Sequence, residues 1–250
     1  MKTKKYLIAG VLMLAMSTPA LAQEVNYAVA LKPIVAAIEA APNDPKAAKD
    51  LIKEYQKNFK KSEEAIVALG NVYLLQHNYD AATEIANNVI NNKKFNGSLA
   101  YVLLGDIAAL KDSIGNAGAA ATQYQNAITV DPQNVTAYER YAKVFRHVNA
   151  KVAVQKLEEL RKVKPDYPVE ATAAEIMLGD GKYKEALEWY AKANPANMSE
   201  DNFYNYGFAA YITKDYQRAL DVAKQGLQKF PNSEYLSRIA MMASVELKDY

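Results

Sequence analysis

The chain repeats one arrangement of small and aromatic residues at a nearly constant interval, and this repetition restricts the possible folds more than any other feature. In the clearest copies a glycine is followed by an aromatic residue nine positions later and by an alanine twelve positions later. These residues are Gly70, Tyr79 and Ala82 in one copy, and Gly207, Tyr216 and Ala219 in another. Apolar residues recur every three or four positions, as on one face of a helix, and no stretch alternates as a strand would. The sequence therefore predicts an all-α fold of stacked helix pairs.

The repeated pattern resembles the tetratricopeptide repeat (TPR) family, whose consensus has Leu-Gly on a first helix and an aromatic residue and alanines on a second. Matching copies begin near Glu63, Ser98, Val135, Tyr167 and Glu200, and their spacings of 32 to 37 residues surround the 34 residues of the family. In this family the small residues lie where helices approach most closely, and aromatic rings fill the gaps. The resemblance implies a right-handed α-solenoid of tandem helix–turn–helix repeats.

The copies also predict how the chain is divided. Residues 23–62 hold N-terminal helices with a degenerate repeat, and residues 234–250 hold the first helix of a further, incomplete repeat or a cap. Between them lie five TPR-like repeats, at about 63–97, 98–134, 135–166, 167–199 and 200–233. Because residues 248–250 reproduce the Lys-Asp-Tyr of residues 214–216, the sequence favours a fragment of a longer array, while a terminal cap stays open.

The first 22 residues have the pattern of a cleaved secretory signal. Residues 1–5 include three lysines, residues 6–16 are apolar and uncharged, and Ala20-Leu21-Ala22 offers a cleavage site. The apolar run is too short to span a bilayer, and no later segment is long and apolar enough to do so. We therefore expect cleavage after Ala22 and a mature protein that is periplasmic or secreted, without a membrane span.

Composition and charge argue against several classes of function. The chain has no cysteine, which excludes disulfides, thiolate metal sites and cysteine nucleophiles. Its two histidines, His77 and His147, have no further ligand at zinc-site spacing, and no nucleotide-binding or hydrolase motif occurs. Of the 30 basic residues three belong to the signal, so the mature chain has 27 against 28 acidic residues and gives no argument for nucleic acid. We expect no enzymatic activity, no cofactor and no metal.

The resemblance implies where a partner would bind. In the TPR family, residues of the first helices line a concave groove that receives a peptide. In this sequence aromatic residues occupy such positions near the C-terminal end, and polar residues occupy them elsewhere. The predicted groove residues are Asn71, Asp106, Arg140, Lys143, Glu175, Tyr204, Phe208, Tyr211 and Tyr235. Exposed rings are favourable anchors for a partner, although they could equally pack against further C-terminal helices.

One known binding mode of the family is not expected. Some members hold a partner's C-terminal carboxylate with a set of Lys, Asn, Asn, Lys and Arg. Here Asn71 and Arg140 match, whereas Val67, Leu103 and Thr136 replace the other three. The sequence therefore does not predict recognition of a chaperone tail.

Together these features predict a protein–protein interaction scaffold of the bacterial cell envelope, which binds a partner polypeptide in the concave groove. Two alternatives stay open: an accessory or N-terminal part of a larger enzyme or transport system, and an envelope glycan-binding module. The second alternative rests on the 18 tyrosines, because exposed tyrosines can stack on sugars. The sequence identifies neither the partner nor the oligomeric state.

Overall fold

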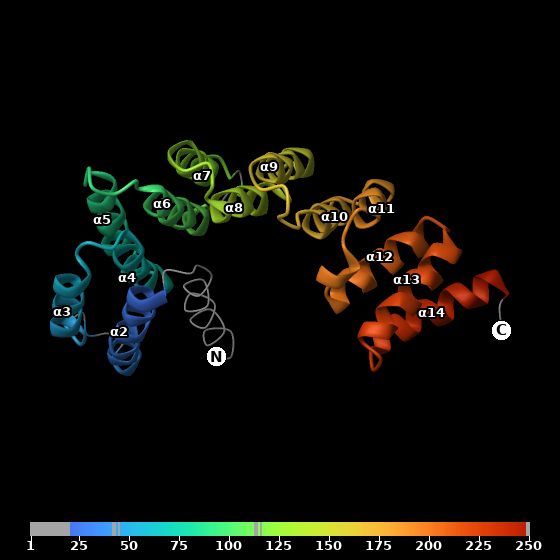
Figure 1. The fold of residues 1–250 in the computed structure, drawn as a ribbon, viewed down its shortest axis with the longest axis horizontal. Helices are drawn as coiled ribbons and strands as arrows, with labels where there is room; N and C mark the ends of the chain where they lie inside the picture. Colours follow the sequence, from blue (N-terminus) through green and yellow to red (C-terminus); the bar gives the residue numbers. More distant parts are fainter. Residues whose placement is uncertain (1–20, 42–43, 45, 113–114, 116, 249–250) are drawn as a thin grey trace. The chain divides into compact units, whose positions relative to one another are not determined.

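The computed structural model describes residues 21–41, 44, 46–112, 115 and 117–248, and all regular structure within them is helical (Figure 1). The predicted all-α fold of tandem helix pairs is confirmed. The helices are α2 (Leu21–Ala40), α3 (Lys49–Phe59), α4 (Glu63–Leu75), α5 (Tyr79–Ile90), α6 (Ser98–Lys111), α7 (Gly118–Val130), α8 (Val135–Phe145), α9 (Ala150–Val163), α10 (Glu170–Gly179), α11 (Tyr183–Tyr190), the 3-10 helix η2 (Pro195–Asn197), α12 (Glu200–Ile212), α13 (Tyr216–Lys229) and α14 (Glu234–Leu247).

The expected secretory signal lies outside the described residues, except for Leu21 and Ala22 in the first turn of α2. No helix in the described part of the chain combines the length and the apolar character needed to cross a membrane.

The helices group into two compact units. Helices α2 to α7 and the start of α8, through Ala137, form the N-terminal unit. The rest of α8, from Tyr138, and helices α9 to α14 form the C-terminal unit. Each unit has its own buried core.

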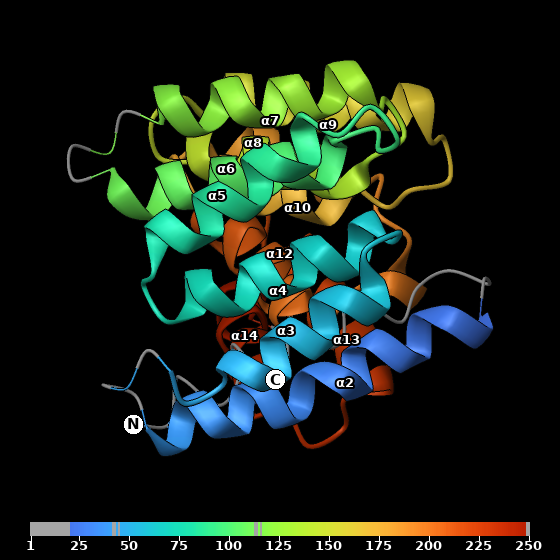
Figure 2. The same cartoon turned by 90° about the vertical axis from the view of Figure 1, so that its left-hand side faces the viewer.

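In the N-terminal unit each helix packs on its neighbours along the chain. Helix α4 contacts α5 and α6, α6 contacts α7, and α2 and α3 pack beside α4 (Figure 2). The hydroxyl of Tyr55 on α3 donates a hydrogen bond of 2.9 Å to the carbonyl of Ala65 on α4. Glu63, the first residue of α4, accepts hydrogen bonds from the backbone N–H groups of Asn96 and Gly97, at 3.1 and 3.2 Å, just before α6. These contacts join successive helix pairs.

Two glycines of this unit lie at close approaches between helices. A Cβ atom added to Gly70 on α4 would lie 2.5 Å from Cδ2 of Leu103 on α6. A Cβ atom at Gly105 on α6 would overlap the ring of Tyr124 on α7, which is fully buried. Because protein cores are close-packed, a side chain at either position would force the helices apart.

In the C-terminal unit α12 packs on α13 and α14, and α10 packs on α11 and α12. Phe203, Leu236 and Ile239 are almost completely buried between these helices. The ammonium group of Lys229, at the end of α13, donates to the carbonyls of Ala196 and Met198 at 2.7 and 2.8 Å, and so holds the loop that contains η2.

Side-chain caps determine where many of the helices begin. At seven helix starts in the described part of the chain a Ser, Asn or Asp accepts a hydrogen bond from the backbone N–H three residues later. These capping residues are Ser62, Asn78, Asn134, Asn149, Ser199, Asp215 and Ser233. At α12 the cap is reciprocal, because the side chain of Asn202 also accepts from the N–H of Ser199.

The first helices of several pairs end in the same backbone conformation. Gly181 follows α10 with φ of 72°, and His77, Lys214 and Lys248 follow α4, α12 and α14 with φ of 60°, 64° and 55°. All four values lie in the left-handed region, in which L-residues other than glycine are uncommon.

Candidate functional site

The predicted groove residues are divided between the two units. Asn71 on α4 and Asp106 on α6 belong to the N-terminal unit. The others belong to the C-terminal unit: Arg140 and Lys143 on α8, Glu175 on α10, Tyr204, Phe208 and Tyr211 on α12, and Tyr235 on α14. All of them are half-buried or exposed, so none is part of a closed core.

The structure brings three of the predicted aromatic residues together and adds a fourth ring. Tyr204 and Phe208 lie one turn apart on α12, with ring centroids 6.1 Å apart and nearly parallel planes. Tyr235 of α14 meets Tyr204 at 5.7 Å, edge to face, and Tyr183 of α11 meets Phe208 at 6.4 Å in the same manner. We call Tyr183, Phe208, Tyr204 and Tyr235 the aromatic row. It is a continuous set of rings from three helices.

Sequence reasoning missed Tyr183 as a member of this set. Its position in the repeat marks it as a packing residue at the start of a second helix, and its ring is half-buried. Only the packing of α11 against α12 shows that this ring extends the row.

Tyr211 takes part in different contacts. Its ring lies 5.4 Å from that of Tyr216 on α13, and its hydroxyl donates to the carboxylate of Glu246 on α14 at 3.4 Å. The structure gives this predicted groove residue a place between α13 and the C-terminal end of α14, apart from the aromatic row.

Charged groups lie next to the aromatic row along α12. Asp201 precedes Tyr204 by three positions, which places both on the same side of the helix. Glu175 accepts a hydrogen bond of 2.5 Å from the amide of Asn202. Burial and the charge of Asp201 raise the pKa of Glu175 above its ordinary value, whereas the hydrogen bond from Asn202 and the charge of Arg146 oppose this rise. Arg146, just after the end of α8, therefore forms one electrostatic cluster with residues of α10 and α12.

The remaining predicted residues differ in their surroundings. Asp106 accepts a hydrogen bond of 2.7 Å from the hydroxyl of Tyr124, the ring that lies against Gly105, so its carboxylate supports the core of the N-terminal unit. Asn71 is half-buried on α4. On α8, Arg140 is half-buried and Lys143 is exposed.

The two histidines lie at helix ends. Nδ1 of His77 is 3.0 Å from the hydroxyl of Tyr79 across the turn between α4 and α5, and His147 is exposed after α8. Among the described residues no three His, Cys, Asp or Glu side chains lie close enough together to hold a metal ion.

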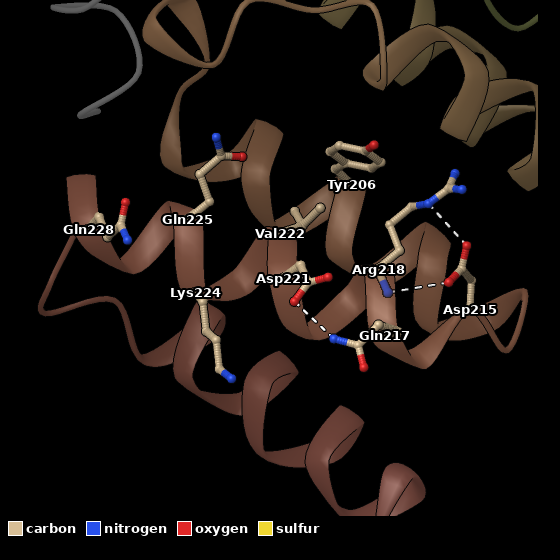
Figure 3. Close-up of a pocket in the computed structure, with 9 residues that line it drawn as sticks. All are labelled: Tyr206, Asp215, Gln217, Arg218, Asp221, Val222, Lys224, Gln225 and Gln228. Atoms are coloured by element: carbon tan, nitrogen blue, oxygen red, sulfur yellow. Dashed lines mark hydrogen bonds and ion pairs between the residues drawn. The ribbon is translucent and has the colours of Figure 1, made fainter. Parts of the chain in front are cut away.

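The surface of α13 carries a shallow polar depression that the sequence did not indicate (Figure 3). Tyr206 of α12 lies at its edge and stacks on Tyr190 of α11 with centroids 5.1 Å apart. Arg218 pairs with Asp215 at 3.0 Å. The other residues that line the depression are Gln217, Asp221, Val222, Lys224, Gln225 and Gln228. Such a surface presents several hydrogen-bonding groups around one ring.

Comparison with protein-family models and with curated proteins gave no match. Several solved structures are similar in fold. YrrB, described as a TPR protein with an unusual peptide-binding site, is 15% identical with a TM-score of 0.50, over 74% of this chain and 95% of that one. MamA is 16% identical with a TM-score of 0.51, over 65% of this chain and 94% of that one.

A third structure with a similar fold is the APC/C hetero-tetramer Cut9–Hcn1. The matched chain is 12% identical with a TM-score of 0.53, over 96% of this chain and 46% of the matched chain. At these identities the similarity concerns the fold and carries no function by itself. From its helix pairs and these structural neighbours, the described part of the chain has the tandem-repeat fold of TPR proteins.

Proposed function

We propose that the chain is a protein–protein interaction scaffold without enzymatic activity of its own, and that a partner polypeptide binds across the aromatic row. The observation that carries this proposal is the contact of four rings from α11, α12 and α14, all of which are half-buried or exposed. The description of YrrB as a protein with a peptide-binding site supports a polypeptide as the partner.

The aromatic row has the properties of a binding hot spot. Tyrosine and phenylalanine supply a large apolar area, and tyrosine adds a hydroxyl group at the edge that can meet a polar backbone. Because each ring is already held against the next, few side-chain rotamers are lost when a partner binds. Buried aromatic contacts of this kind often dominate the binding free energy of an interface.

The charged cluster beside the row supplies direction to the partner. Asp201 lies one turn before Tyr204 on α12, and Glu175 of α10 accepts a hydrogen bond from Asn202, with Arg146 close enough to lower the pKa of Glu175. A bound polypeptide would place apolar side chains on the rings and hydrogen-bonding groups beside these charges. Charge placement of this kind determines the orientation of a partner more than its affinity.

The test is affinity capture from the cell envelope followed by mass spectrometry, with and without two of the rings. The double variant Tyr204→Ala and Phe208→Ala should reduce the recovery of the specific partner at least about tenfold, because two hot-spot residues are removed. Circular dichroism should show unchanged helix content.

The chain offers a matched control for this experiment. Tyr141 and Phe145 of α8 are also four positions apart, half-buried and stacked, with centroids 5.1 Å apart. The variant Tyr141→Ala and Phe145→Ala should retain the partner. Equal recovery with both double variants would contradict a binding site at the aromatic row.

We propose in addition that the protein works in the cell envelope, either in the periplasm or secreted, after cleavage behind Ala22. The pattern of the first 22 residues supports this location. Mass spectrometry of the protein from cell fractions should find Gln23 as its first residue and the periplasmic or extracellular fraction as its source. A cytoplasmic protein that retains Met1 would contradict this location.

The polar depression on α13 favours one alternative partner, an envelope glycan. Tyr206 offers part of an aromatic surface, and Gln225 and Gln228 offer amide groups that can bind hydroxyls (Figure 3). A glycan array should then give binding that the double variant Gln225→Ala and Gln228→Ala removes and that Tyr204→Ala leaves intact. An array without binding would set this alternative aside.

A further inference from the structure

The outer face of α14 carries charges in an order that is complementary to itself. Glu234, the first residue of α14, precedes Met241 by seven positions, which is close to two helical turns, and Lys248 follows Met241 by seven as the left-handed residue that ends the helix. Arg238 and Val245 lie between them on the same face by helical spacing. All five residues are exposed, and Met241 and Val245 have 62% and 51% of their surface accessible.

The opposite face of α14 accounts for its packing within the unit. Leu236, Ile239 and Ala243 are buried against α12 and α13, with at most 2% of their surface accessible. The outer face is therefore additional to the core. Two apolar side chains that are more than half exposed, with charges at both ends, have the composition of a small interface with a polar rim.

We propose that this outer face pairs with the same face of a second copy of the chain, with the two α14 helices antiparallel and a two-fold axis at Met241. In this arrangement Glu234 of each copy lies opposite Lys248 of the other, and the two Met241 side chains meet at the centre. The contact is isologous, so it closes after two copies.

Charge decides between the two possible directions of pairing. A parallel pair would place Glu234 against Glu234 and Lys248 against Lys248, which is repulsive at both ends. An antiparallel pair replaces these contacts by two ion pairs, and it also aligns the helix dipoles favourably.

The small residues of the face permit a close approach. Ser237 faces Val245 of the second copy, and Ser244 faces Arg238, so that no large side chains oppose each other outside the centre. Met241 has a flexible side chain that adapts to an identical neighbour. Because one helix pair buries less area than a standard interface, the dimer is weak and depends on concentration.

Sedimentation equilibrium of the protein over a range of concentrations tests the proposal. The protein should show a monomer–dimer equilibrium in the micromolar range. Met241→Lys should leave a monomer, because it places two positive charges together at the axis. Glu188→Lys, at an exposed position of α11, makes a comparable surface change and should leave the dimer unchanged.

A charge exchange identifies the direction of pairing. Glu234→Lys and Lys248→Glu should each weaken self-association by about tenfold, because each introduces two like-charge contacts. A mixture of the two variants should form a heterodimer at about the original strength, since it has one ion pair of the original polarity and one of reversed polarity.

Two results would overturn the proposal. One is a monomer at all concentrations up to about a hundred micromolar, where a contact of this size should be populated. The other is a dimer that persists in Met241→Lys, or variants that do not associate preferentially when mixed. Circular dichroism of each variant should match the original protein because all substituted side chains are exposed.

Discussion

Four helix ends share a left-handed residue, and only one of them is glycine. Gly181, His77, Lys214 and Lys248 take this conformation after α10, α4, α12 and α14. A side chain with a Cβ atom is destabilised there by roughly 1 kcal/mol or more. The left-handed conformation identifies His77 as a turn residue. The three positions without glycine are also places where a substitution by glycine can stabilise the chain.

Lys214→Gly should therefore raise the free energy of unfolding by about 0.5–1 kcal/mol, because relief of the left-handed strain exceeds the entropy that glycine adds to the unfolded chain. Urea denaturation measures this change. Gly181→Lys is the reverse test, since no atom lies within 4 Å of a Cβ atom there, and it should lower stability by about 1 kcal/mol. Shifts in the same direction for both variants would contradict the explanation.

Gly105 serves a different purpose from Gly181. Its missing side chain gives room to the ring of Tyr124, whose hydroxyl is held by Asp106. Gly105→Ala should lower the free energy of unfolding by about 1–3 kcal/mol, the usual cost of overfilling a core, despite the better helix propensity of alanine.

Gly179, at the end of α10, is the matched control for Gly105, because a Cβ atom there meets no atom within 4 Å. Gly179→Ala should leave stability unchanged or raise it by up to about 1 kcal/mol. Thermal unfolding of both variants provides the comparison, and equal losses in both would refute the packing argument for Gly105.

At the scale of helices, one side chain of α13 holds the loop before α12. The ammonium group of Lys229 donates hydrogen bonds to the carbonyl oxygens of Ala196, within η2, and of Met198, directly after it. Lys229→Met retains the apolar stem but removes both hydrogen bonds, and it should lower stability by roughly 1–3 kcal/mol.

Hydrogen exchange provides a local measurement of this effect. Amides of residues 194–199 should exchange faster in Lys229→Met, while amides in the middle of α12 keep their protection. Unchanged exchange in the loop would show that Lys229 does not hold it.

The sequence predicted the helical fold because its strongest signals are local. Small residues such as Gly70 and Gly105 recur at spacings that only paired helices explain, and their close contacts with Leu103 and Tyr124 follow from that packing. Side-chain caps such as Ser233 have the residue types expected at helix starts.

The candidate site was only partly accessible from sequence, because its contacts join different helices. Helical spacing places Tyr204 and Phe208 on one side of α12, but it does not say which ring of α11 reaches them. Tyr183 was therefore missed. The polar depression was missed as well. The repeat pattern indicates that Tyr206 is a packing residue, and it does not show which side chains of α13 lie beside it.

At the scale of the whole molecule, stability is distributed over contacts between successive helices. In a repeat array each helix pair gains stability mainly from its immediate neighbours. A local defect should therefore remain local. In Gly105→Ala, hydrogen exchange should increase across α6 and α7 and in the adjoining α5, whereas α12 to α14 keep their protection. A uniform increase throughout the described helices would indicate one cooperative unit.

The bond from Glu63 to the turn before α6 has a consequence for synthesis. Its carboxylate finds the N–H of Gly97 only after 34 further residues have been added, and Gly70 meets Leu103 later still. As the chain leaves the ribosome from its N-terminus, α4 and α5 are completed by a helix that has not yet emerged. The final packing of a helix pair therefore waits until the next repeat has been synthesised. Until then the most recently synthesised helix pair is the segment that a chaperone can still reach.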